Sequence, residues 1–206
     1  MKLSLLLLNQ LIIMLCFLLI GYVLAKKKLI TMDGCKELVN LLLLVVIPFV
    51  ILNSFLVEKT NEKTIGLLCA MLLSLISFIL SMGFSYLFYG TKHRIENFSA
   101  AFSNAGFIGI PLVQATLGSE MVFYIACYVA FLNIFQWIYG AYIMSGDKKN
   151  ISIHNILTNA VLISFGLSFL LYMLGLNNIP YLKNVAQSIA AVSYTHLRAH
   201  ETRGNL

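Results

Sequence analysis

Charged residues are scarce in this chain of 206 residues. Asp, Glu, Lys and Arg make up 11% of it, against 60% hydrophobic residues and a mean hydropathy of +0.88. A soluble globular domain carries about twice that share of charge, so the composition excludes one. It also excludes a disordered chain and a disulfide scaffold, because both contain far fewer aliphatic residues. The composition is that of an integral membrane protein.

Several chemical motifs are also absent. No Gly-rich Walker loop occurs, so the chain is not itself an ATP-driven motor. The four cysteines have neither metal-binding nor redox spacing, and we expect small buried apolar side chains and no cofactor or metal. They are Cys16, Cys35, Cys69 and Cys127. The net charge of +6 does not indicate nucleic acid, because lysines at loop ends are usually topology signals.

The charged positions divide the chain into uncharged windows, each long enough for a helix of about 20 residues that crosses a bilayer. The windows are residues 3–25, 38–57, 64–91, 97–119, 121–146 and 150–182. Six spans are predicted, the sixth over 156–176, with a seventh starting near Lys183. Such runs must be helical, because lipid satisfies no backbone polar group. The first is predicted to be a retained helix rather than a signal peptide. The predicted fold class is an all-α polytopic membrane protein.

Basic residues are distributed unevenly between alternate loops. The first, third and fifth loops carry eight of them: Lys26, Lys27, Lys28, Lys36, Lys92, Arg94, Lys148 and Lys149. The opposite side carries four: Lys2, Lys59, Lys63 and Lys183. Loops rich in lysine and arginine stay in the cytoplasm. We therefore predict a multi-pass protein of the plasma membrane with its amino terminus outside.

The fourth window is unusually rich in polar and small residues. They are Asn97, Ser99, Ser103, Asn104, Gly106, Gly109, Pro111, Gln114, Thr116 and Gly118. Pro111 lacks an N–H and should interrupt the helix near Phe107, while Gly106 and Gly109 tolerate unusual dihedral angles. A broken helix at membrane depth survives only when it is buried in protein or lines a wet cavity, and its ends attract anions. The alternative is a kinked helix that only packs against its neighbours.

Weaker polar groups occur in two other windows. Pro48, Asn53 and Ser54 lie in the second, and Asn133 and Gln136 lie in the fifth. Helix packing explains these polar residues more readily than function does. No Asp, Glu, Lys or Arg lies in any window, so neither an intramembrane active site nor a proton relay is predicted there.

Residues 101–113, AFSNAGFIGIPLV, resemble the fourth-helix motif of the auxin efflux carrier family. Gly21-Tyr22 before three lysines, and residues 128–133 before Trp137, extend the resemblance over about residues 1–190. Members resemble ten-helix secondary transporters built from two inverted five-helix repeats, whose broken fourth and ninth helices cross at the substrate site. The resemblance implies that residues 1–150 form the first repeat and residues 151–190 open the second.

The resemblance further implies a carrier that moves a small organic anion, such as a dicarboxylate or an auxin-like acid, by alternating access. Asn104 is the expected direct contact. The other candidate substrate-binding residues are Ser103, Gly106, Gly109, Pro111, Asn133, Asn53 and Ser54. Plant members carry proline where this chain has Ser103, and prokaryotic relatives are linked to malonate and malate. A non-transporting membrane subunit is the alternative function, and a homodimer is a candidate assembly.

The end of the chain differs in character from the rest. Residues 193–202, SYTHLRAHET, are polar and resemble the translation of a transposon-type sequencing adapter. Such additions are excluded from fold reasoning. We expect residues 191–206 to be a non-native tail and the native part to be an amino-terminal fragment.

Overall fold

The computed structural model describes residues 2–103, 105–147, 149, 151–176 and 179–198, and this part of the chain contains helices and no strand. The elements in chain order are α1 (Lys2–Lys26), α2 (Met32–Leu41), η1 (Leu42–Val46), α3 (Ile47–Phe55), α4 (Asn61–Tyr89), α5 (Arg94–Ala101), η2 (Ala105–Gly109), α6 (Ile110–Leu117), η3 (Ser119–Met121), α7 (Val122–Phe135), η4 (Gln136–Gly140), α8 (Ala141–Ser145), α9 (Ile153–Leu157), α10 (Ala160–Met173) and α11 (Pro180–Arg198). The predicted all-α fold class is confirmed.

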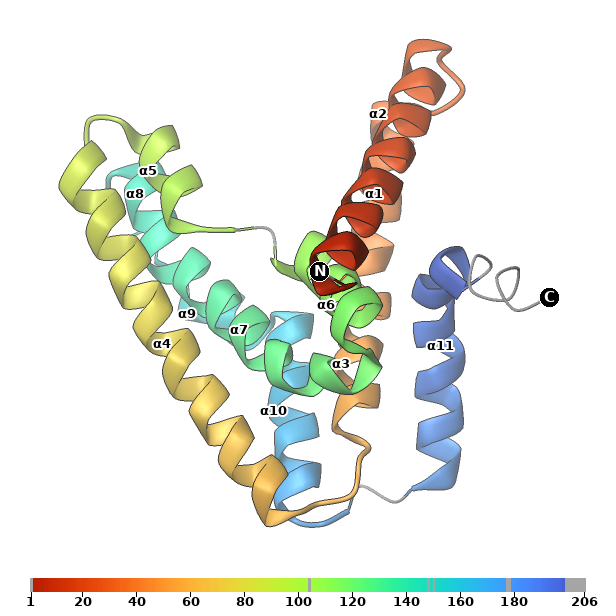
Figure 1. Ribbon diagram of the computed structural model, residues 1–206. Helices are drawn as coiled ribbons and strands as arrows, with labels where there is room; N and C mark the ends of the chain where they lie inside the picture. The colour runs from red at the N-terminus through yellow and green to blue at the C-terminus, as the bar shows by residue number, and fades with distance from the viewer. Residues whose placement is uncertain (1, 104, 148, 150, 177–178, 199–206) are drawn as a thin grey trace.

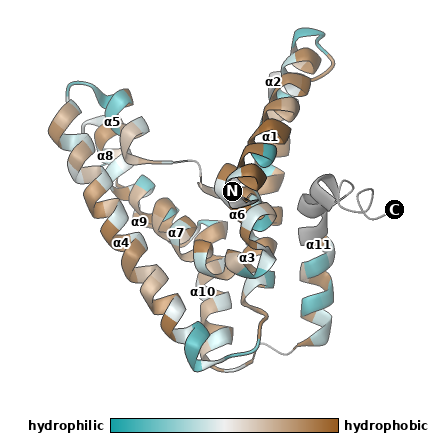
Figure 2. Cartoon of the chain, viewed as in Figure 1, coloured by the Kyte–Doolittle hydropathy of each residue, from teal (hydrophilic) through white to brown (hydrophobic). Residues whose placement is uncertain are grey.

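Four helical stretches are long and apolar enough to cross a membrane. They are Ser4–Lys26, Asp33–Phe55, Asn61–Tyr89 and Ser119–Ser145, and they match the first, second, third and fifth predicted windows. Figure 2 shows hydrophobic residues along most of the length of α1 and α4. Only 6% of the α1 window is buried, so this helix offers its surface to lipid. The protein is a multi-pass membrane protein.

The sixth predicted span is not continuous. Helix α9 ends at Leu157, and α10 starts only at Ala160 and has 14 residues. Between them Asn159 takes an extended conformation and its side chain accepts from the N–H groups of Val161 and Leu162, as an N-cap does. The expectation of one helix over residues 156–176 is therefore wrong.

Helix α11 runs from Pro180 to Arg198, so the seventh helix begins three residues before Lys183. Its backbone passes Ala190 without interruption, and residues 199–206 lie outside the described part of the chain. Leu52 of α3 and Leu56, which directly follows α3, form a small buried cluster with Ala186 of α11. The non-native origin of residues 191–206 stays a prediction.

The helices form two arms that spread from a common base (Figure 1). One arm consists of α1 and α2 side by side, and the other consists of the upper part of α4 with α5 and α8. At the base, α3 packs against α7 and α10, and α4 packs along α7. An aromatic cluster fills this base, with ring centroids 4.7 Å apart for Phe55 and Phe123 and 5.0 Å apart for Phe123 and Tyr172. The arms thus stand on a packed core.

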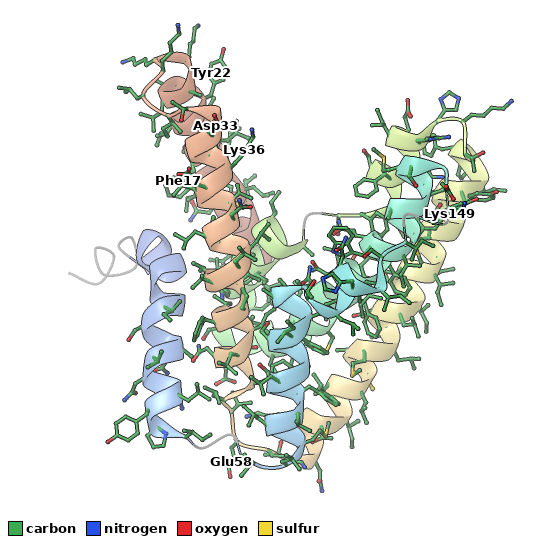
Figure 3. The ribbon with its side chains drawn as sticks, turned by 180° about the vertical axis from the view of Figure 1, so that it is seen from behind. Phe17, Tyr22, Asp33, Lys36, Glu58 and Lys149 are labelled. Carbon is green, nitrogen blue, oxygen red and sulfur yellow. The ribbon has the colours of Figure 1, made fainter. Side chains whose placement is uncertain are left out.

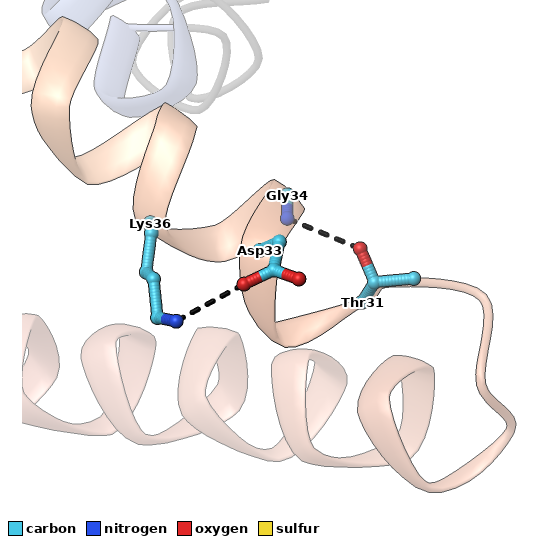
Figure 4. A network of polar contacts seen from close by, with 4 residues as sticks. All are labelled: Thr31, Asp33, Gly34 and Lys36. Carbon is cyan, nitrogen blue, oxygen red and sulfur yellow. Dashed lines mark hydrogen bonds and ion pairs between the residues drawn. The ribbon is translucent and has the colours of Figure 1, made fainter.

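The outer end of the first arm is shaped by a helix cap. Thr31 precedes α2, and its Oγ1 accepts from the backbone N–H of Gly34 at 3.1 Å (Figure 4). Asp33 in the first turn forms an exposed ion pair with Lys36 at 3.0 Å. A threonine cap followed by an acidic residue satisfies the free N–H groups and matches the helix dipole. These polar residues end the apolar span.

The ends of the two arms share the same side of the molecule. Figure 3 places Asp33 and Lys36 at the end of the first arm, Lys149 toward the same end, and Glu58 at the opposite end. This agrees with the predicted grouping of alternate basic loops on one side of the membrane. Which side faces the cytoplasm stays a prediction.

The cysteines differ from the expectation. Cys127 in α7 is buried, whereas Cys16, Cys35 and Cys69 are exposed, and all four are free. The expectation of buried side chains is wrong for three of them, because these positions lie on the outer faces of α1, α2 and α4.

Candidate functional site

The fourth predicted helix is broken. Helix α5 ends at Ala101, and Phe102 has an extended conformation with φ −125° and ψ 128°. Helical structure resumes at Ala105 with the π-helical turn η2 and continues into α6. The predicted break is therefore present, but it lies at Phe102 and Ser103 rather than at Pro111. Asn104 lies outside the described residues.

Pro111 does not interrupt the helix because a π-helical turn precedes it. A proline leaves the carbonyl four residues earlier without its usual donor, and that carbonyl belongs to Phe107, inside η2. In a π-helical turn a carbonyl pairs with the N–H of the fifth residue after it, so in this pattern a proline four residues after a carbonyl removes no needed donor. Pro48 also follows a π-helical turn, η1, in which the N–H of Ile47 donates to the carbonyl of Leu42, five residues earlier.

The two glycines of this segment have ordinary backbone angles. Gly109 is helical with φ −67° and ψ −46°, and Gly106 is not among the described residues with positive φ. The segment therefore does not use the freedom of glycine to adopt unusual dihedral angles at these two positions. A Cβ atom at Gly109 would lie 3.4 Å from Cδ1 of Ile125, and one at Gly106 would lie 3.7 Å from Cδ1 of Ile47. Both distances are ordinary van der Waals contacts, so a methyl group would fit at either position.

A cleft of about 860 Å³ lies between the two arms. All three π-helical turns in the described part of the chain contribute to its wall: η1 through Leu43 and Leu44, η2 through Gly106, and η4 through Gln136. The break contributes Phe102 and Ser103, and the connection between α9 and α10 closes the cleft from another side. Single π-helical turns within helices are frequent at functional sites. Their convergence here marks the cleft as the candidate site.

The polar groups of the cleft are uncharged. Its described lining includes five carboxamides, Asn40, Asn133, Gln136, Asn155 and Asn159, and no ionisable acidic or basic side chain. The amide of Asn133 donates to the carbonyl of Val129 at 2.8 Å, and Asn159 donates to Oδ1 of Asn133 at 3.2 Å. Within the described residues, the side chains of Gln136 and Asn155 make no hydrogen bond, so their N–H groups can bind a ligand.

The structure brings three predicted site residues together. Ser103, Gly106 and Asn133 all line the cleft. The hydroxyl of Ser103 lies 3.2 Å from that of Tyr128 in α7, so the break is in contact with the fifth span. Asn104 falls between Ser103 and Gly106 in the sequence, but its own placement is not described.

The other four predicted site residues lie elsewhere. Gly109 packs against α7, and Pro111 lies in the first turn of α6. Ser54 is buried near the end of α3 and donates to the carbonyl of Ile51 at 2.7 Å, so its hydroxyl is satisfied within its own helix. Neither Asn53 nor Ser54 lines the cleft.

Three carboxamides of the cleft were missed at the sequence level: Asn40, Asn155 and Asn159. Asn159 stands directly before the apolar run of α10, which is an N-cap signal that could have revealed it. Asn40 and Asn155 carry no such signal, because only the tertiary packing brings them to the cleft.

The fold and the cleft define a multi-pass membrane protein with a broken helix beside a largely apolar, uncharged cavity that carries several carboxamides. A family model described as Membrane transport protein (Mem_trans) matches residues 6–190, and the chain belongs to this family, that of the auxin efflux carriers. The protein is thus a membrane transport protein and not an enzyme. Neither a curated protein nor a solved structure matches the chain.

Proposed function

We propose that the protein is a secondary carrier that moves a small organic anion by alternating access, and that the cleft is its substrate site. The observation that carries this proposal is the opening of a broken helix onto a cleft with two carboxamides, Gln136 and Asn155, whose side chains make no hydrogen bond to the described residues. Irregular backbone at membrane depth is tolerated where it lines a cavity, and transporters bind substrates at such breaks.

The chemistry of the cleft suits a carboxylate. The N–H groups of Gln136 and Asn155 can donate to carboxylate oxygens without placing a fixed charge in the membrane, where one costs at least about 2.5–3.5 kcal/mol. The cavity volume of about 860 Å³ lies in the usual range for small-molecule sites and exceeds the size of a dicarboxylate. Asn104 is the further contact that we propose from the sequence.

The arrangement also suits two repeats that move against each other. We propose that residues 1–150 form the first repeat and that residues 151–190 open the second, in the plasma membrane with the amino terminus outside. Asn133 belongs to the first and Asn159 to the second, so their hydrogen bond at 3.2 Å joins the two. A site at the junction of two repeats can open to either side when one rocks against the other.

Uptake by proteoliposomes tests the proposal. The purified full-length protein is reconstituted and given radiolabelled malonate or, separately, radiolabelled indole-3-acetate. We expect saturable uptake of at least one of them, and Gln136→Leu should raise its KM by about tenfold, because one hydrogen bond to a charged group is lost. Ser54→Ala is the matched control, since it removes a polar group far from the cleft, and should leave the KM unchanged. Uptake no greater than in protein-free liposomes would favour a non-transporting subunit and reject the proposal.

A further inference from the structure

Two serines of α4 bind the backbone of the half-helix α5. Ser81 donates through Oγ to the carbonyl of Ala101 at 2.7 Å, and the hydroxyl of Ser85 lies within hydrogen-bond distance of both carbonyl oxygens of Asn97. The two serines are four residues apart, and so are their partners on the antiparallel α5. One face of α4 therefore binds α5 at two successive turns.

The bond from Ser81 pairs a backbone carbonyl that the break leaves without a partner in its own helix. The last carbonyls of a helix have no partner within it, and in a membrane no water replaces that partner. Ala101 is the final residue of α5, and its main-chain oxygen receives the hydroxyl of Ser81. The end of α5 at the break is thus satisfied by α4.

Asn97 forms a second attachment. Its side chain is fully buried, its Nδ2 donates to the carbonyl of Gly90 at 2.7 Å, and its Oδ1 accepts from the hydroxyl of Tyr139 at 2.8 Å. The carbonyl of Gly90 requires a donor, which fixes the orientation of the amide. Asn97 therefore joins α5 to the α4–α5 turn and to η4.

The two halves of the broken helix have different neighbours. Helix α5 packs against α4 and α8, whereas α6 packs against α1 and α7. A Cβ atom at Gly140 of η4 would lie 2.7 Å from the ring of Phe98, which shows how closely α5 and η4 approach. The break at Phe102 and Ser103 thus separates two differently held segments.

We propose that Ser81, Ser85 and Asn97 are positioning residues that fasten α5 to α4 and η4. These segments carry the first side of the break as one unit. The inference rests on the proposed function, in that it takes the break to be part of the substrate site. It adds that the hydrogen bonds of α4 set where Ser103 stands in the cleft.

The rate of chemical labelling at the break tests this positioning. Ser103→Cys is introduced into the full chain with its four cysteines replaced by alanine, and a membrane-impermeant thiosulfonate reagent is applied. Each bond removed should release the break and speed the labelling by about threefold, the effect of an average hydrogen bond between membrane helices. Ser81→Ala should speed the labelling of the cysteine at position 103 by about threefold, and Ser81→Ala combined with Ser85→Ala should speed it by about tenfold.

Ser74→Ala is the matched control. Ser74 is also a serine of α4, but its hydroxyl donates to the carbonyl of Ala70 in the same helix, so the labelling rate should not change. A cysteine introduced by Leu117→Cys, on the other side of the break, should react at the same rate in every background. Such a local effect distinguishes positioning from a general loss of stability.

Equal labelling of the Ser103→Cys thiol in the parent, the Ser81→Ala variant and the Ser74→Ala control would overturn the inference. Ser81→Ala alone decides if the double variant does not fold, because it leaves the contacts of Asn97 intact. Labelling needs no substrate. Faster labelling in a protein that takes up neither malonate nor indole-3-acetate would therefore reject the proposed function while supporting the positioning role.

Discussion

Asn159 donates through Nδ2 to Oδ1 of Asn133 at 3.2 Å, while its own Oδ1 accepts from the N–H groups of Val161 and Leu162 at 3.0 and 3.2 Å. One carboxamide therefore caps α10 and ties the start of that helix to α7. Both residues line the cleft. The contact that stabilises α10 is thus also part of the candidate site.

Replacing Asn159 should lower stability as well as function. Asn159→Ala removes the cap of α10, and we expect a loss of about 1 kcal/mol, seen as a lower midpoint of thermal unfolding in detergent. Asn155→Ala is the matched comparison, because its free amide caps no helix. It should raise the KM for the transported anion by about tenfold and leave the midpoint unchanged. Equal unfolding midpoints for the two variants would contradict this division of roles.

Gly140 should not tolerate a side chain. A Cβ atom there would lie 2.7 Å from Cε2 of Phe98 and 3.2 Å from Cε2 of Phe102. Gly140→Ala should therefore destabilise the protein by about 1–3 kcal/mol, because α5 must shift away from η4. Gly83→Ala in α4 is the control, since nothing lies within 4 Å of its Cβ position, and it should be neutral or stabilise the helix by up to about 1 kcal/mol. Thermal unfolding of both variants measures the difference, and equal midpoints would refute it.

The continuous spans could be predicted from the sequence because their limits are set by charge. Lys63 and Lys92 lie close to the two ends of α4, whose observed bounds are Asn61–Tyr89. The break in the fourth helix was also predicted, from its density of polar residues. The position of the break was not predicted, because a π-helical turn precedes Pro111 and the helix continues through it, whereas the end of α5 at Ala101 is bonded by Ser81 of a different helix.

The cleft residues Asn40 and Asn155 could not be predicted from the sequence. Asn40 and Asn155 are ordinary polar residues near helix ends, and only the packing of distant elements brings them together. The exposed cysteines illustrate the same limit. Composition places Cys16 and Cys69 in membrane spans, but which face of the helix meets lipid depends on the neighbouring helices.

Asn104 and Pro111 should affect transport in different ways. In the full-length protein, Asn104→Ala should raise the KM for the anion and leave expression and insertion intact, because a direct contact is lost. Pro111→Ala restores an N–H and allows η2 to return to α-helical bonding, so it should act through geometry and lower the maximal rate. Uptake and folded yield measured for both variants separate the two effects. An unchanged KM for well-folded Asn104→Ala would reject the contact.

The orientation of the protein can be tested with a cysteine that it already carries. Cys35 is exposed near the start of α2, beside Lys36 and at the same end as the lysines of the first loop. Eight basic residues in the loops of that side, against four on the other, predict that Cys35 faces the cytoplasm. In intact cells a membrane-impermeant maleimide should therefore leave Cys35 unlabelled until the membrane is permeabilised.

The labelling site matched to Cys35 lies at the opposite end of the molecule, on the predicted outer side of the membrane. Lys59 lies in the connection between α3 and α4, so Lys59→Cys in a chain with Cys35→Ala should be labelled in intact cells without permeabilisation. Cys16 and Cys69 lie in apolar spans, where a charged reagent does not reach them, and Cys127 is buried. The signal therefore reports on positions 35 and 59. Labelling of Cys35 in intact cells, with protection of the thiol introduced by Lys59→Cys, would place the amino terminus inside and contradict the prediction.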